Sequence, residues 1–202
     1  LGTGVSAGAS ITEATQASGV VKVTAESGSA VSVIFTNGTK SVTKTLTGSG
    51  VSQAVVLSDK DISTLTDGVI SVTTKTIDVA GNVSSIGSIS FTLDTLAPGS
   101  PILVLGTGVS TIASITEATQ ASGVVQVTAE SGSTVSVIFT NGTQSVTKTL
   151  TGSGGSQAVV LTSNDASTLK DGTISVSATV KDAAGNISAS NTSFLLDTAA
   201  PG

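Results

Sequence analysis

An internal repeat with a period of 104 residues constrains this chain more than any other feature of its sequence. The ten residues ITEATQASGV occupy positions 11–20 and return, letter for letter, at positions 115–124. When residues 1–82 are aligned with residues 105–186, 64 positions are identical and no gap is needed. A period of about a hundred residues is the size of a whole domain, and it is too long for one turn of a solenoid. The chain therefore contains two copies of one unit.

The limits of the two domains follow from matching segments. The segment APGS closes the first copy, and APG ends the chain. We predict one domain at residues 1–97 and a second at residues 98–202, with a linker at about 95–104. Because both copies end on the same motif, we expect the chain to be part of a longer array.

The composition excludes several kinds of chemistry. Charged residues make up 10% of the chain, well under the roughly 25% of ordinary globular domains, and the formal net charge is −5. The chain has no Cys, His, Trp, Tyr or Met. It can therefore form no disulfide bond, and it lacks the commonest general base and the soft metal ligands. We expect no enzymatic activity and no small-molecule substrate, since no motif for a nucleophile is present either.

The same composition bears on partners. The eight Lys and Arg residues are scattered and are outnumbered by 13 acidic residues, which disfavours nucleic acid. No apolar run reaches the roughly 18 residues that span a bilayer, and the residues after Leu1 do not form a signal peptide. We expect a monomer that does not insert directly into a membrane, and whose partners are neighbouring repeats of the same chain.

Short strands are expected throughout each copy, because apolar residues alternate with polar ones and no stretch shows a helical period. Asn37-Gly38 lies between two alternating runs and predicts a tight hairpin, since both residues tolerate positive φ. The connection 58–68 has room for one helical turn. The strands expected in the first copy lie within residues 3–12, 20–25, 30–39, 41–46, 53–57, 69–77 and 88–94.

About seven strands in a hundred residues predict an all-β fold, namely two tandem immunoglobulin-like antiparallel β-sandwiches with about seven strands each. The disulfide and core Trp of antibody domains are missing, so the likeness is to the wider group of sandwiches. The core must consist of Val, Ile, Leu and Phe, and its largest members are Phe35, Phe91, Phe139 and Phe194.

Two motifs connect the chain with a known family. The segments FTLDTLAPGSP (91–101) and FLLDTAAPG (194–202) follow DVAGN (78–82) and DAAGN (182–186), respectively. This combination resembles the tandem bacterial Ig-like repeats of the large RTX-type surface adhesins of Gram-negative bacteria, which serve in biofilm formation and attachment. The resemblance implies an extracellular extender, secreted and tethered to the outer membrane as part of a longer chain, with calcium at domain junctions.

The positions of the acidic residues in the expected strand order test the calcium prediction independently of the family resemblance. If successive turns alternate between the two ends of a sandwich, one group of acids lies where the chain leaves the first domain, and another lies where it enters the second. The first group is Glu13, Asp61, Asp67 and Asp94. The second group is Glu130, Asp182 and Asn186. The linker, which contains Pro98 and Pro101, would bring these two ends face to face.

Calcium takes six to eight oxygen ligands, from carboxylates, carbonyls and water. We therefore predict a Ca²⁺ site at the junction, completed by a carbonyl of Thr95 or Gly185 and by water. Asp61 is the weakest candidate of its group. The predicted ligands are Glu13, Asp67, Asp94, Asp182 and Asn186. The equivalent positions at the outer ends are Asp78, Asn82, Glu117, Asp171 and Asp197.

Simpler interpretations of the same residues stay open at this point. Asp67 and Asp171 stand in TDG and KDG, which are common turn sequences, and the aspartates of DVAGN and DAAGN could cap the backbone of plain turns. Glu13 taken alone is a solvated carboxylate. Asp94 and Asp197 end an apolar strand directly before the linker sequence, a position that fits a ligand better than a turn cap.

Two functions compete. The first is a calcium-rigidified extender that projects a distal binding region of a giant adhesin away from the cell. The alternative is a ligand-binding adhesin module for a glycan or a protein. The absence of Trp and Tyr disfavours the alternative, because sugar sites usually contain an aromatic platform. The near-identity of the copies also favours length over specialised recognition.

Overall fold

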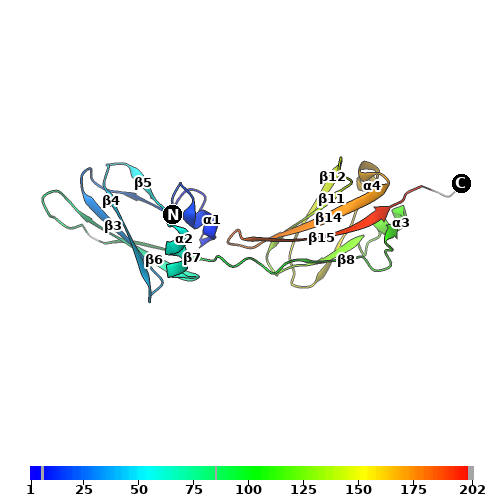
Figure 1. The fold of residues 1–202 in the computed structure, drawn as a ribbon, viewed down its shortest axis with the longest axis horizontal. Helices are drawn as coiled ribbons and strands as arrows, with labels where there is room; N and C mark the ends of the chain where they lie inside the picture. Colours follow the sequence, from blue (N-terminus) through cyan, green and yellow to red (C-terminus); the bar gives the residue numbers. More distant parts are fainter. Residues whose placement is uncertain (6, 85, 200–202) are drawn as a thin grey trace. The chain divides into compact units, whose positions relative to one another are not determined.

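A computed structural model describes residues 1–5, 7–84 and 86–199. The last three residues of the FLLDTAAPG motif lie outside this range. The chain divides into two compact units, Leu1–Leu96 (unit 1) and Ala97–Gly202 (unit 2). Each unit is built of strands that lie in two sheets, with short helices at the connections (Figure 1).

Unit 1 has a five-stranded sheet of order β1-β7-β6-β3-β4 and a two-stranded sheet of β2 and β5. Two short helices, α1 and α2, connect strands of different sheets. The strands are β1 (Gly8–Ala9), β2 (Val21–Thr24), β3 (Ala30–Thr36), β4 (Ser41–Thr47), β5 (Ser52–Val55), β6 (Gly68–Ile77) and β7 (Gly87–Leu93). The helices are α1 (Ile11–Thr15) and α2 (Asp59–Leu65).

Unit 2 repeats this plan with one strand more. Its five-stranded sheet has the order β12-β11-β14-β15-β9, and its second sheet has the order β13-β10-β8. The strands are β8 (Ile102–Leu105), β9 (Ile112–Ala113), β10 (Val125–Thr128), β11 (Thr134–Thr140), β12 (Ser145–Thr151), β13 (Ser156–Val159), β14 (Gly172–Lys181) and β15 (Ile187–Leu196). The helices are α3 (Ile115–Thr119) and α4 (Ser163–Leu169).

The predicted all-β sandwich class is confirmed, and the helical turn expected in 58–68 is α2. The opening strand differs from the prediction. In unit 2 it is split into β8, which pairs antiparallel with β10, and β9, which pairs parallel with β15, so the sheets are not purely antiparallel. The break lies at Gly106, where a Cβ atom would stand 1.8 Å from the carbonyl oxygen of Gly123. Only glycine allows the backbones to approach this closely.

Each unit has its own apolar core between its sheets. Alternate residues of the strands point inward, so that in β3 Val31, Val33 and Phe35 are buried while their neighbours are not. All four phenylalanines are buried, as the sequence predicted, two in each core. The two clusters of buried residues share no member, so each sandwich is stabilised by its own apolar contacts.

The hairpin at Asn37-Gly38 is longer than expected. The strands end at Thr36 and resume at Ser41, and φ is positive at Gly38 but not at Asn37. The side-chain oxygen of Asn37 instead accepts hydrogen bonds from the N–H groups of Thr39, at 3.0 Å, and Lys40, at 2.8 Å. The predicted hairpin is confirmed, since β3 pairs antiparallel with β4. The expected positive φ at Asn37 was wrong, because asparagine closes the loop with its side chain rather than with a left-handed backbone.

A partly buried ion pair joins the second helix of each unit to the neighbouring strand. Asp165 of α4 accepts a hydrogen bond from the Nζ of Lys148 at 2.6 Å, and Asp61 of α2 forms the matching pair with Lys44. Both aspartates also complete a capping box with the residue that precedes the helix. Burial acts to raise the pKa of Asp165, but hydrogen bonds from Lys148 and Thr162 outweigh it and leave the pKa below its usual value.

This lowered pKa predicts a pH-dependent contribution to stability. Because the folded pKa of Asp165 is depressed, its contribution is present above the unfolded pKa of about 4 and is lost as the pH falls through the folded pKa. We expect Asp165→Asn to lower the free energy of unfolding by roughly 1 kcal/mol at pH 6. Urea titrations at pH 6 and at pH 2.5 should show this difference shrinking at the lower pH, and Asp61→Asn should behave alike in unit 1. A difference that is the same at both pH values would contradict the assignment.

Candidate functional site

The chain enters and leaves a unit at opposite ends of the sandwich. In unit 2 the first strand begins at Ile102, which pairs with Thr128 beside the β10–β11 turn. The last strand ends at Leu196, which pairs with Gly172 at the other end of β14. We call these the entry end and the exit end. Unit 1 has the same exit end, where Leu93 pairs with Gly68.

Two predicted ligands of unit 1 hold the chain as it leaves the sandwich. Asp67 lies between α2 and β6, and its Oδ1 accepts hydrogen bonds from the N–H of Thr95 at 3.0 Å and from its hydroxyl at 2.8 Å. Asp94 directly follows β7, donates its N–H to the carbonyl of Ala9 and accepts the N–H of Leu96 at 3.2 Å. The two aspartates therefore lie at the exit end, close to the same short segment.

Glu13 lies in α1, not in the plain turn expected between the first two strands. The side chain of Ser10 caps this helix by accepting the N–H of Glu13 at 3.3 Å. The equivalent Glu117 in α3 completes a capping box, in which its carboxylate accepts hydrogen bonds from the N–H of Ser114 at 2.8 Å and from that of Ser110 at 3.2 Å. The hydrogen bonds from Ser114, followed by that from Ser110, lower the pKa of Glu117.

The exit end of unit 2 repeats the aspartate contacts. Asp171 accepts hydrogen bonds from the N–H of Thr198 at 2.8 Å and from its hydroxyl at 2.6 Å, and these bonds lower the pKa of Asp171. Asp197 accepts the N–H of Ala199 at 3.1 Å. The Thr that follows Asp in both LDT sequences is thus a partner of an acid about 28 residues earlier in the chain, which sequence reasoning missed.

The predicted ligands at the entry ends lie in the turns between the last two strands. The Oδ1 of Asp182 accepts the N–H groups of Gly185, at 2.7 Å, and Asn186, at 2.9 Å, while Oδ2 accepts the Asn186 amide at 3.0 Å. In unit 1, Asp78 binds the N–H and the amide of Asn82, both at 2.7 Å, and the amide contributes most to lowering the pKa of Asp78. The interpretation of these aspartates as turn caps is confirmed.

The carboxylates therefore already have partners within their own units. Across residues 1–5, 7–84 and 86–199, no three Asp or Glu residues form a group that could hold a metal ion. A carboxylate has about four lone-pair positions, so one that accepts one to three N–H groups keeps some capacity for a cation. The backbone contacts also hold the acids in fixed positions, whereas ordinary surface carboxylates are mobile. The predicted calcium site remains a prediction.

Sequence reasoning also missed an asparagine that ties the hairpin to the helix. The amide of Asn37 donates to the carbonyl of Leu65 at the end of α2, and Asn141 donates to Leu169 in unit 2. The only signal was the identical spacing of these residues in both copies. The contact fixes the segment that leads to Asp67 and Asp171, and so it supports the positions of both aspartates.

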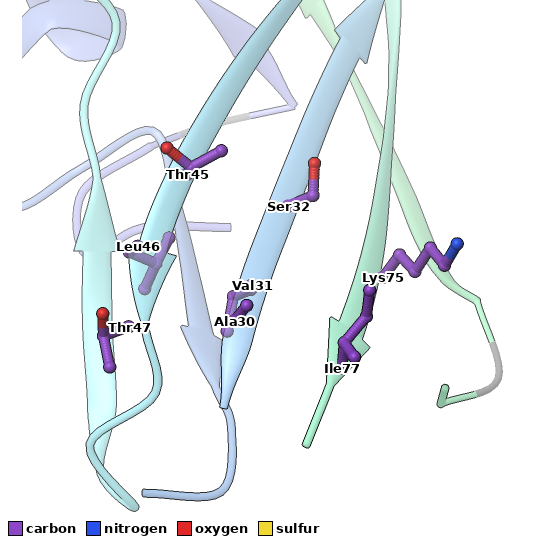
Figure 2. A pocket seen from close by; sticks show the side chains of 8 residues that line it. All are labelled: Ala30, Val31, Ser32, Thr45, Leu46, Thr47, Lys75 and Ile77. Atoms are coloured by element: carbon purple, nitrogen blue, oxygen red, sulfur yellow. The ribbon is translucent and has the colours of Figure 1, made fainter. Parts of the chain in front are cut away.

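A shallow hollow of about 390 Å³ on unit 1 bears on the alternative function (Figure 2). It lies over β3, β4 and β6, and its lining includes one charged side chain, that of Lys75, and no carboxylate or aromatic ring. Two of its apolar residues, Ala30 and Ile77, are replaced in the second copy by Thr134 and Lys181. The lining of the hollow thus differs between the two copies, and nothing in it favours a sugar.

Known proteins give matches at the level of structure. No family model matches the chain, and no curated protein sequence matches it significantly. A crystal structure of a tetra-tandem repeat in the extending region of a large adhesion protein is 28% identical over 85% of this chain and 42% of that one, with a TM-score of 0.39. A Ca²⁺-stabilized adhesin, which helps an Antarctic bacterium reach out and bind ice, is 25% identical over 90% and 44%, with a TM-score of 0.43.

A third structure belongs to a 1.5-MDa bacterial ice-binding adhesin, at 22% identity over 87% of this chain and 55% of that one, with a TM-score of 0.37. The chain thus spans about half the length of the structures that it matches, or less. Within the described ranges, no helix has the length and apolar character needed to cross a membrane. All three matched structures come from proteins described as an adhesin or a large adhesion protein, and the first of them is a tandem repeat of an extending region.

Proposed function

We propose that the two units are extender repeats of a giant adhesin, which hold a distal binding region away from the surface of a Gram-negative cell. The observation that carries the proposal is the opposite placement of the entry and exit ends within one sandwich. A copy inserted in the chain therefore adds about the length of a ten-residue strand, roughly 33 Å, to the path of the polypeptide. A fold whose termini lie side by side would add almost none.

The independence of the cores supports the same function. Each sandwich has its own buried cluster and needs nothing from a distant repeat, which suits an array of variable length. The short strand before the first helix of each unit is also a parallel neighbour of the last strand, β1 with β7 and β9 with β15. Tension along the chain would shear these strands past each other, so that the hydrogen bonds between them would bear the force at the same time.

Calcium at the junction is the finer part of the proposal. The exit end of unit 1 has Asp67 and Asp94 beside the chain that leads to unit 2, and the entry end of unit 2 has Asp182. Hard oxygen ligands of this kind suit Ca²⁺, and neither His nor Cys is present to favour a softer metal. The ion would bind Glu13, Asp67, Asp94, Asp182 and Asn186, and it would restrict the swing of the linker.

The proposal predicts saturable calcium binding that depends on the acids at these two ends. Isothermal titration of the two-unit chain with CaCl₂ should show a site, and Asp94→Asn combined with Asp182→Asn should raise its Kd by roughly tenfold or more, because ligand charge sets affinity. Both residues mainly accept N–H groups, so asparagine keeps an acceptor and the fold should remain. The variant Asp165→Asn, whose carboxylate pairs with Lys148, is the matched control and should bind calcium as the unaltered chain does.

Two results would count against the calcium part. The first is the absence of any binding heat at millimolar calcium, and the second is an unchanged Kd in the double variant. Neither would affect the extender part, which depends on the positions of the chain ends. That part is contradicted if scattering of chains with two, four and six copies shows a maximum dimension that does not grow with the number of copies.

A further inference from the structure

The parallel strands β9 and β15 lie where tension along the chain would act on unit 2. The chain runs from the entry end through β8 and β9 to the exit end, and β15 also runs toward the exit end. A pull on the two ends of the unit would therefore draw β9 toward the entry end and β15 toward the exit end. The two strands would slide past each other if their mutual contacts failed.

The pairing of these strands is short. β9 has two residues, and both pair with the end of β15. One flanking hydrogen bond runs from the N–H of Leu195 to the carbonyl of Thr111, at 2.8 Å. Another runs from the N–H of Asp197 to the carbonyl of Ala113, at 3.0 Å. Since β14 and β15 pair over ten residues, β9–β15 is the weaker of the two contacts of β15, and its resistance to shear depends on what holds the neighbouring residues.

A carboxylate holds the chain just beyond β15. Asp171 lies directly before β14, and its Oδ1 accepts the N–H of Thr198 at 2.8 Å and the hydroxyl of the same residue at 2.6 Å. These bonds attach the departing chain to the start of the neighbouring strand. Unit 1 has the same contacts between Asp67 and Thr95. A pull on the exit end would reach these bonds before it reached the parallel strands.

A second carboxylate holds β9. Oε1 of Glu117 accepts the N–H of Ser110 at 3.2 Å, and Oε2 accepts the N–H of Ser114 at 2.8 Å. Ser110 precedes the strand and Ser114 follows it, so one side chain attaches both ends of β9 to α3. The helix is itself anchored, because Ala118 is completely buried and α3 contacts α4. A pull from the entry end would therefore act on the helix and the core as well as on β9.

The backbone directly before each exit aspartate is strained. φ is 60° at Lys170 and 59° at Thr66, although neither residue is glycine. Such a conformation is costly and persists where the surrounding structure imposes it. In unit 2 the amide of Asn141 holds the carbonyl of Leu169, one residue earlier. Because lysine and threonine adopt the same φ, the position requires the strain, and the strain places the following aspartate beside the departing chain.

We propose that Asp171 and Glu117 are mechanical clips, which strengthen the contact of β9 with β15 so that the folded unit resists tension. Asp67 has the role of Asp171 in unit 1. This inference rests on the proposed extender function, in which force acts on both ends of a unit. The clips need no cation, because their partners are N–H and hydroxyl groups of the same unit.

The test applies constant tension to the two ends of the whole two-unit chain. Two unfolding events are expected, one for each unit. Asp171→Ala should make one of them about tenfold faster at a fixed force, because two hydrogen bonds that resist the pull are lost. Glu117→Ala should act in the same direction. The other event should keep its rate and serve as an internal reference. Chelator is present throughout, so that bound calcium does not contribute.

Asp165→Asn is the matched control. Its ion pair with Lys148 lies at β12, the opposite edge of the sheet from β9, so this variant should lose stability in urea but unfold at an unchanged rate under tension. Thr198→Val removes the hydroxyl donor alone and should act more weakly than Asp171→Ala, which keeps the test decisive if the alanine variant does not fold.

Two results would overturn the proposal. One is an unchanged unfolding rate under tension in both Asp171→Ala and Thr198→Val. The other is an equal acceleration by Asp165→Asn, which would show that any loss of stability has the same effect. Neither result bears on whether the chain lengthens with the number of copies, so the clips and the extender function can fail separately.

Discussion

Phe139→Ala is expected to lower the free energy of unfolding of unit 2 by about 3–5 kcal/mol. Phe139 is completely buried in β11, where Val146 and Val176 are its cross-strand neighbours. No Trp, Tyr or Met in the chain is available to fill the space, and the surrounding side chains are mostly short and branched. Since a domain is stable by about 5–15 kcal/mol, the loss is a large fraction of the total.

Calorimetry of the two-unit chain measures this effect, with hydrogen exchange to assign each transition to a unit. For a unit of this size, about 1 kcal/mol shifts the midpoint by roughly 4 °C or more, so the transition of unit 2 should fall by more than about 10 °C. Ile138→Ala is the control, because Ile138 is next in the same strand but is 37% exposed, and its effect should be much smaller. Phe35→Ala should act in the same way on unit 1. An equal shift of both units would contradict separate cores.

The strands could be predicted from the sequence because their signal is local. Alternation of apolar and polar residues located β3, β4, β6 and β7 to within a few residues of their observed limits. The burial of the four phenylalanines followed from the same alternation. The short length of the copies and the number of strands then left the sandwich as the architecture that could bury such a pattern.

The parts that could not be predicted depend on contacts between distant residues. The split of the opening strand follows from the close approach of Gly106 and Gly123, which lie 17 positions apart and carry no pattern of their own. The same is true of α1, whose five residues are too few to show a helical period. Ser10 fixes its start by accepting an N–H group, a role that serine also fills in ordinary turns.

In the candidate site, too, some features could be predicted from the sequence and others could not. The strand order alone indicated that Asp67 and Asp94 lie at one end of a sandwich and that Asp182 lies at the other end of its own. It could not indicate which carboxylates also hold the backbone, because capping and metal binding use the same oxygen atoms. The threonines of the two LDT sequences decide this for Asp67 and Asp171, and they pair with acids far away in the sequence.

If the proposed junction site binds calcium, removal of the ion should make the linker between the two units more flexible. Two carboxylates 5 Å apart repel each other by about 3 kcal/mol at an effective dielectric constant near 20, and a site with four of them holds several such pairs. Without a cation, the acids of the two ends should therefore keep apart and leave the linker free to bend. A bound Ca²⁺ would reverse the sign of this interaction and hold the ends together, so that a bending chain becomes a rod.

The distance between matched positions of the two copies tests this claim most directly, and a chain without cysteine allows specific labelling. Suitable sites are Val51→Cys and Gly155→Cys, since Val51 is 64% exposed and a Cβ on Gly155 would meet no atom closer than 3.8 Å. Single-molecule energy transfer between dyes on these sites should give one narrow, long distance in calcium. In chelator it should give a broad distribution with a shorter mean. The same broad distribution in both conditions would contradict the account.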